Sequence, residues 1–385
     1  MKTMAKTLAL LLVTVLTTAC GNGGNGGGTG ETGNAGSKAD STVSVIKAVK
    51  ARKPGRKAKK KSVLTPGATG SPYEILVVAN PEDFQTGAYD SLFAVLTDEI
   101  PGLPQAEPQF RVSKVSTSNY SKTLKYCRNI IELKINPERY TKCRIKYSQD
   151  VYSVPQFIMT IQAPDARSFC DFVADSHDVI IDFFNRAELQ REATKLMGDC
   201  NPNIRKLVMK KFGCEVSVPC ELGKIKNGKD FLWAATDKGE NDMNFVIYSY
   251  PYTDPETFTE EYCLKMRDSV MKANIPGPLD GMYMQTSRPF VKVYDSSVHG
   301  EYAQFARGLW DISNYDMGGP FVSISRVDEK NGRVVVAEGF VFAPNGIKRK
   351  LIRRMEASLY TLFLPDELDL RNNQFEIEEI TIKPE

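Results

Sequence analysis

Histidine is scarce in this chain: among 385 residues, only His177 and His299 carry an imidazole. Metal centres take histidine, cysteine or carboxylate ligands at short spacings, but the patterns H-E-x-x-H and C-x-x-C are both missing. Also missing are the G-x-S-x-G motif of serine hydrolases and the G-x-x-x-x-G-K-[ST] motif of phosphate-binding loops. We therefore predict no catalytic residue, no metal site and no cofactor. Carboxylates distant in the sequence could still meet in space, as a glycosidase requires.

The apolar run near the start of the chain is short. Thr7–Leu16 spans about 15 Å as a helix, half of the ~30 Å hydrocarbon core of a bilayer. Two lysines precede the run and small residues follow it, which is typical of an export signal. Ala19 and Cys20 close it as a bacterial lipobox does, with Thr17 where leucine is usual. We predict that residues 1–19 are a lipoprotein signal peptide and that Cys20 is lipidated. The alternative is a signal peptide cut after Ala19, which would leave a soluble protein.

A glycine-rich segment follows Cys20. Nine of the sixteen residues from Gly21 to Gly36 are glycine, and they contain a formal G-x-G-x-x-G. A dinucleotide-binding loop needs a strand before this motif and a helix after it, whereas here a predicted signal peptide comes first. A chain of this kind has high backbone entropy and nothing to bury. We predict a disordered tether over residues 20–70.

The second part of the tether is strongly basic. From Lys47 to Lys61 there are nine Lys or Arg residues and no acid. Residues 20–70 carry ten bases and two acids, whereas residues 71–385 carry 38 bases and 45 acids. The basic run is either a solvated linker or a segment attracted to anionic lipid head groups. We expect no nucleic-acid partner, because an exported protein meets little of it and the lysines lack interleaved aromatics.

Residues 71–385 are predicted to form a globular body, and the chain as a whole is 42% hydrophobic and 10% aromatic. Apolar periodicity predicts an α+β fold with mixed or antiparallel sheets and helices packed on them. The order strand, helix, strand, strand, helix occurs twice, so the body allows two related halves, 71–200 and 201–385. Strands are predicted at 73–79, 109–116, 128–135, 154–162, 215–220, 231–236, 243–250, 281–294, 300–312 and 320–328. Helices are predicted at 83–100, after Asp165, at 203–212, at 255–273 and at 346–363.

Seven cysteines follow Cys20, an odd number that leaves at least one thiol free if the others pair within the chain. Cys214 and Cys220 flank a strand-like run. A straight strand would hold them about 20 Å apart, too far for a disulfide. They could pair only if the chain turned at Pro219, or with other partners.

Several stretches of the body together resemble a Bacteroidetes lipoprotein family known only as domain of unknown function number 4837. They are SPYEILVVAN (71–80), IPGLPQAEPQF (100–110), RNIIELKI (128–135), KKFGCEVSVP (210–219), RGLWDISNYDMGGPFVSISRVD (307–328) and GFVFAPNGIKRKLIRRMEASL (339–359). The likeness covers nearly the whole body, and its most specific parts are 317–321 and 340–344. The resemblance implies an envelope lipoprotein and supplies no catalytic residue.

Two surfaces are candidate sites. The predicted last helix begins with Lys348, Arg349 and Lys350, although a helix N-terminus is already positive. A bound anion, such as a phosphate or a partner's carboxylate, would relieve this repulsion; the alternative is a solvated face.

The second candidate is DMGGPF (316–321), where Gly-Gly-Pro predicts an unusual turn with positive φ. Trp310, Tyr315, Met317 and Phe321 could form an aromatic lip there for a glycan, a peptide or another partner. The alternative is a packing corner of the core.

Together these observations predict a lipid-anchored envelope protein that binds or scaffolds another envelope component. The alternatives are a hydrolytic enzyme that acts on envelope material through a carboxylate site, and a structural spacer. In bacteria of the kind that the resemblance implies, surface export of lipoproteins usually follows an acidic cluster just after the cysteine, and Gly21 to Gly30 contains no acid. We therefore expect the body to face the periplasm, with the inner leaflet of the outer membrane favoured over the inner membrane.

Overall fold

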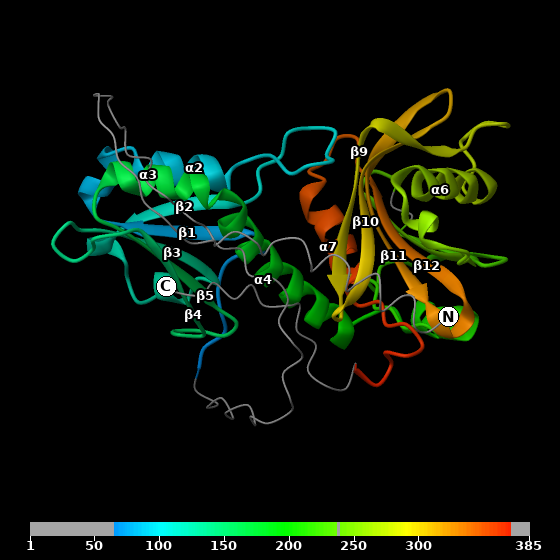
Figure 1. Cartoon of the computed structure of the whole chain (residues 1–385), viewed down its shortest axis with the longest axis horizontal. Helices are drawn as coiled ribbons and strands as arrows, with labels where there is room; N and C mark the ends of the chain where they lie inside the picture. Colours follow the sequence, from blue (N-terminus) through cyan, green and yellow to red (C-terminus); the bar gives the residue numbers. More distant parts are fainter. Residues whose placement is uncertain (1–64, 237–238, 371–385) are drawn as a thin grey trace, which may run out of the picture. The chain divides into compact units, whose positions relative to one another are not determined.

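The computed structural model describes residues 65–236 and 239–370, which belong to one compact unit (Figure 1). The predicted signal peptide, Cys20 and nearly all of the predicted tether, including Lys47 to Lys61, lie outside the described residues. In the part that is described, no helix is both long enough and apolar enough to cross a membrane. The described chain contains two sheets with helices packed on them, which confirms the predicted α+β class.

The first sheet has five strands in the order β2-β1-β3-β5-β4. Its first four strands are parallel, and β4 pairs antiparallel with β5 at the edge. Short apolar runs form the central strands, and burial on both faces explains why they do not alternate with polar residues. The strands are β1 (Glu74–Ala79), β2 (Arg111–Ser116), β3 (Asn129–Ile135), β4 (Arg144–Gln149) and β5 (Phe157–Ala163).

Three helices pack over the first sheet, and their apolar side chains form one core with one face of it. They are α2 (Ala88–Leu96), α3 (Ala166–Asp175) and α4 (His177–Gly198). Figure 1 shows α2 and α3 side by side, in agreement with their contacts. The opposite face, with Leu76 and Ile130, is covered by the segment after β2, which contains the 3₁₀ turns η2 (Thr117–Asn119) and η3 (Leu124–Tyr126).

The second sheet has seven antiparallel strands in the order β6-β7-β8-β12-β11-β10-β9. Strands β9 to β12 form a meander in chain order, and β12 also pairs with β8. The turn between β11 and β12 contains Asn331 and Gly332, and Gly332 has a φ of 61°. The strands are β6 (Lys224–Gly228), β7 (Phe231–Ala235), β8 (Asp242–Pro251), β9 (Met284–Val298), β10 (Glu301–Ile312), β11 (Tyr315–Asp328) and β12 (Arg333–Phe342).

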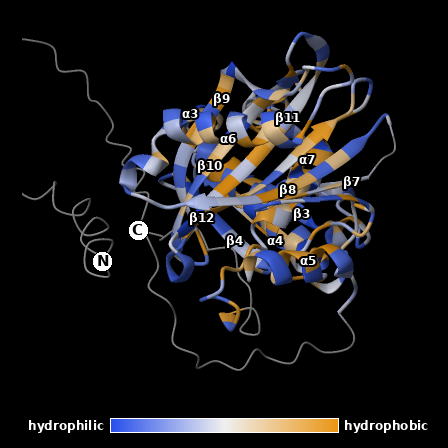
Figure 2. Cartoon of the chain, turned by 90° about the vertical axis from the view of Figure 1, so that its right-hand side faces the viewer, coloured by the Kyte–Doolittle hydropathy of each residue, from blue (hydrophilic) through white to orange (hydrophobic). Residues whose placement is uncertain are grey.

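Helices cover both faces of the second sheet. On one face, α5 (Pro202–Phe212) and α7 (Arg349–Leu359) contribute to a core that contains Phe245 and Val322. On the other face, α6 (Glu260–Asn274) packs on a core that contains Trp310 and Phe321. Figure 2 shows the hydrophobic strands of this sheet in orange and exposed hydrophilic residues of α5 in blue. Three further 3₁₀ turns complete the described chain: η1 (Pro81–Gln85), η4 (Pro255–Phe258) and η5 (Glu329–Asn331).

The predicted elements and the structure differ in several places. The helix predicted at 83–100 is divided into η1 and α2, because Gly87 between them has a left-handed backbone with a φ of 79°. The strand predicted at 215–220 is buried irregular chain with a single bridge from Glu215 to Phe363. The edge strands β4 and β6 were not predicted, because their polar sequences RIKYSQ and KIKNG lack an apolar run.

The predicted turn at DMGGPF is wrong, because β11 runs through these residues and neither glycine has a positive φ. The reversal lies just before, at Asn314, which has a φ of 58°. Close backbone approach explains the two glycines instead. A Cβ atom at Gly319 would lie 2.0 Å from the carbonyl oxygen of Val341, and one at Gly318 would lie 2.6 Å from that of Trp310.

Candidate functional site

The N-terminus of α7 binds a carboxylate that comes from within the chain. The carboxylate oxygens of Glu107 accept hydrogen bonds from the backbone N–H groups of Lys348, at 2.7 Å, and Arg349, at 3.0 Å. Lys348 offers no side-chain cap of its own, so Glu107 satisfies amides that the helix cannot satisfy internally. A negative charge at this end also complements the helix dipole. The position at which we predicted an external anion is therefore occupied by Glu107.

Most of the cations around this helix end contact the same loop, between α2 and β2. The Lys348 ammonium donates to Gln105 Oε1 at 2.5 Å, and Arg349 donates to the carbonyl oxygen of Pro108. Arg353 donates to the backbone and side chain of Gln109 and lies 3.9 Å from the centre of the Tyr73 ring. Burial lowers the pKa of Arg353 to about 10. Lys350 alone of the predicted trio is exposed.

The predicted aromatic lip does not gather on one surface. Trp310 is only 3% exposed and donates its indole N–H to the carbonyl oxygen of Val341 at 3.3 Å. Phe321 is fully buried, and Met317 is half-buried against the same core. Of the four residues only Tyr315, at 47%, is exposed. Their positions in the structure are those of a packing corner.

Several buried carboxylates are paired with arginines. Glu338, fully buried in β12, receives hydrogen bonds from Arg267 Nε at 2.9 Å and Nη2 at 2.7 Å. Burial lowers the pKa of Arg267, but the Glu338 charge and its hydrogen bonds outweigh this, so the net shift is upward. Arg267 also donates to Thr286 Oγ1 and lies 3.8 Å from the centre of the Phe321 ring. This pair is a structural element of the core.

A second buried pair fixes the chain after α7. Glu367 accepts hydrogen bonds from both Nη atoms of Arg326 and contacts His299 Nδ1 at 3.4 Å. Burial alone would raise the pKa of Glu367, but the hydrogen bonds from His299 and Arg326 lower it to about 2. In α4, Glu188 forms ion pairs with Arg128 and Arg191. The lowered pKa of Glu367 makes this carboxyl a poor proton donor for catalysis.

The histidines and cysteines of the described residues do not gather into a metal-binding cluster. In the part of the chain with a described structure, no three His, Cys, Asp or Glu side chains gather as metal ligands would. His177 lies between Asp98 and Asp178 at the surface. The seven cysteines that follow Cys20 carry free thiols, and burial raises the pKa of Cys214 to about 12 and of Cys263 to about 11. Thiols with such pKa values react slowly as nucleophiles.

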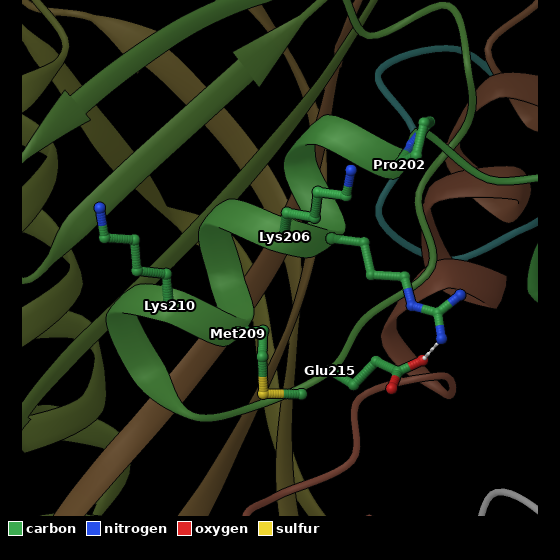
Figure 3. A pocket seen from close by; sticks show the side chains of 6 residues that line it. Pro202, Lys206, Met209, Lys210 and Glu215 are labelled. Atoms are coloured by element: carbon green, nitrogen blue, oxygen red, sulfur yellow. Dashed lines mark ion pairs between the residues drawn. The ribbon is translucent and has the colours of Figure 1, made fainter.

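Sequence reasoning missed a shallow pocket on α5. Its volume is about 460 Å³, and it is lined by Pro202, Arg205, Lys206, Met209, Lys210 and Glu215, which we call the α5 pocket (Figure 3). The helix itself was predicted at 203–212; in the structure Asn201 caps its first amides, and Gly213 ends it with a φ of 63°. The overlooked signal lies in the exposed residues of this helix, where Met209 comes between Lys206 and Lys210 in the sequence.

The α5 pocket combines free cations with an apolar surface. Arg205 Nη2 is bound to Glu215 Oε1 at 2.6 Å, whereas Lys206 and Lys210 are exposed and have no carboxylate partner among the described residues. Met209 is 36% exposed, and in Figure 3 it points toward Glu215 while both lysines extend away from it. This arrangement can attract an anion and cover an apolar group beside it.

Comparison with protein families identifies two matches along the chain. Residues 201–361 match the family described as Domain of unknown function (DUF4837), and residues 68–197 match Domain of unknown function (DUF8532). Comparison with curated proteins gave no match. The predicted resemblance is confirmed over residues 201–361, whereas the stretches quoted from 71–80, 100–110 and 128–135 lie in the region of the second family. The chain is thus similar to the DUF4837 family over residues 201–361 and to the DUF8532 family over residues 68–197.

Proposed function

We propose that this protein is a lipid-anchored component of the bacterial cell envelope that binds another envelope component and does not itself catalyse a reaction. Lipid on Cys20 would attach it to the membrane, and the basic run from Lys47 to Lys61 would contact anionic head groups. The body would face the periplasm from the inner leaflet of the outer membrane. Its ligand would be an envelope protein, glycan or lipid.

The observation that carries the binding role is the composition of the α5 pocket. Its two exposed lysines attract negative charge, and Met209 offers a flexible apolar contact of the kind that adapts to different ligands. The single carboxylate in the pocket, Glu215, is bound to Arg205. These six lining residues can recognise a ligand by charge and by apolar contact. They include neither a second carboxylate nor a nucleophile that could transform the ligand chemically.

The anchoring half of the proposal predicts the behaviour of the variant Cys20→Ser. The serine cannot accept the thioether-linked lipid, so we expect the protein to move from the membrane fraction to the soluble periplasmic fraction. The measurement is fractionation after a high-salt wash, which screens the attraction of the basic tether, together with the intact mass of the wild-type N-terminus. A variant that stays in the washed membranes, or a wild-type protein that retains Met1 and has no acyl group, would contradict lipid anchoring.

The proposed binding role predicts that crosslinking in intact cells depends on where in the protein the crosslinking residue is placed. A photo-crosslinking amino acid at position 209 should form an adduct with the bound envelope protein, glycan or lipid, because this side chain is exposed inside the α5 pocket. The control is the same amino acid at exposed Lys265 on α6, which covers the opposite face of the sheet. Equal labelling at the two positions, or none at position 209 in a folded protein, would refute a binding role for the pocket.

A further inference from the structure

Positive charge is concentrated around α5 although the body as a whole is acidic. Residues 202–230 carry seven Lys or Arg and three acids, whereas residues 71–385 together carry 38 bases and 45 acids. Two of the three local acids are engaged, because Glu215 binds Arg205 and Glu221 binds Arg354. The remaining charge of this region is therefore strongly positive in an otherwise negative body.

The structure brings these charges together from two elements. The Lys211 ammonium, in the last turn of α5, donates to the carbonyl oxygens of Gly228 and of Phe231, the latter at 3.2 Å. These contacts hold the turn between β6 and β7 beside the end of α5, and Lys229 lies in that turn. We call the exposed residues Lys206, Lys210 and Lys229 the basic face; Met209 lies beside it and points toward Glu215 (Figure 3). All three lysines are exposed and have no carboxylate partner among the described residues.

The chemistry of this face suits a surface of phosphate groups better than a single bound anion. Lysine acts as a compact point charge without the fixed fork of arginine, so it favours many weakly oriented phosphates over one precise contact. The α5 pocket is shallow, and Met209 and Pro202 are the apolar residues of its lining. A flat array of anionic head groups above an apolar layer matches both properties.

We propose that the basic face docks on the anionic phospholipid surface of the membrane to which the protein is tethered. This inference rests on the proposed lipid anchor, which would supply the same membrane at a high local concentration. A flexible chain of roughly 50 residues has an r.m.s. span of about 40 Å, so the body would stay within reach of that surface. The body would then lie with α5 and the β6–β7 turn toward the lipid.

The test is vesicle binding by the full mature chain carrying Cys20→Ser, which has no lipid. The vesicles contain equal parts phosphatidylglycerol and phosphatidylcholine, and phosphatidylcholine alone serves as the neutral control. Each lysine near an anionic surface contributes roughly a fivefold gain, so Lys206→Gln/Lys210→Gln/Lys229→Gln should weaken binding by up to about 100-fold. The matched control is Lys142→Gln/Lys146→Gln/Lys330→Gln, which removes the same charge from exposed positions elsewhere and should retain wild-type binding.

The outcomes separate this proposal from its alternatives. Equal weakening by the two triple variants would mean that only net charge and the basic tether matter, and would overturn the proposal. Displacement by inorganic phosphate well beyond that by sodium chloride of the same ionic strength would indicate a discrete phosphate site and would also overturn it. Because the assay uses unlipidated protein, its failure leaves the anchor untouched, and the fractionation of Cys20→Ser decides the anchor separately.

Discussion

Replacing Arg267 by methionine should lower the free energy of unfolding by about 3–5 kcal/mol, because it leaves the Glu338 carboxylate buried without its partner. Both side chains are at most 2% exposed, and Arg267 contributes both a bidentate ion pair and a hydrogen bond to Thr286. Methionine fills a similar volume against Phe321, so the loss should come mainly from the uncompensated charge. Chemical denaturation at neutral pH, monitored by circular dichroism, measures the effect.

The pH dependence provides a second readout of the same pair. Burial raises the pKa of Glu338, and Arg267 opposes that shift. Without the arginine, the folded variant should bind a proton that the unfolded chain releases at its ordinary pKa of 4.5. The stability of Arg267→Met should therefore fall as the pH rises above about 4.5, relative to the wild type.

Two variants control for nonspecific damage. Arg288→Ala removes an arginine whose side chain is 48% exposed and paired with Asp268, and it should cost no more than about 1 kcal/mol. Arg267→Met/Glu338→Leu removes both charges and should recover much of the stability. If the double variant is as unstable as Arg267→Met, or if Arg267→Met costs no more than Arg288→Ala, the buried-charge explanation fails.

Removing the carboxylate of Glu107 should lower the free energy of unfolding by about 2–3 kcal/mol in Glu107→Ala. The change leaves two backbone N–H groups at the start of α7 without an acceptor and removes the negative charge nearest to that helix end. Lys348, only 3% exposed, would keep only neutral acceptors for its ammonium. Thermal and chemical unfolding of the purified body in chloride buffer measure the loss.

An added anion should partly rescue this variant. Glu107→Ala exposes the helix amides that the carboxylate occupied, so inorganic phosphate should raise its melting temperature more than that of the wild type. Glu99→Ala, in the same loop but with an exposed side chain, is the control and should behave like the wild type in both respects. A Glu107→Ala protein as stable as Glu99→Ala would show that α7 does not depend on this carboxylate.

Local sequence patterns predicted most of the elements, because their signals are local. Runs such as EILVVA and NIIELKI read as buried strands, and Asn201 and Gly213 mark the two ends of α5. The Asn331-Gly332 turn is equally local. Predictions were wrong where the contact that decides the structure is distant. Gly318 and Gly319 predicted a turn from composition, whereas the close approach of strands β10 and β12 explains them.

The candidate sites depended on tertiary structure for the same reason. The charge pattern at Lys348 to Lys350 indicated that α7 needs an anion, but Glu107, which supplies one, is 241 residues away in the sequence from Lys348. Likewise, the aromatic content of 310–321 gave no information on which side chains the sheet buries. Lys206 and Lys210 became a candidate surface only once the structure showed that Glu215, the carboxylate in the same pocket, is paired with Arg205.

By itself, the sequence determined the α+β class, most element positions, the uneven charge of tether and body, and the candidate export signal. Tertiary structure decided which cations are satisfied within the chain and which face solvent, because pairing between Arg or Lys and a carboxylate depends on distances of a few ångströms between residues far apart in the chain. It also decided that Trp310 lies in the core and that Lys206 and Lys210 are exposed at the surface. Periodicity is a property of neighbouring residues, whereas a binding surface is a property of the packed molecule.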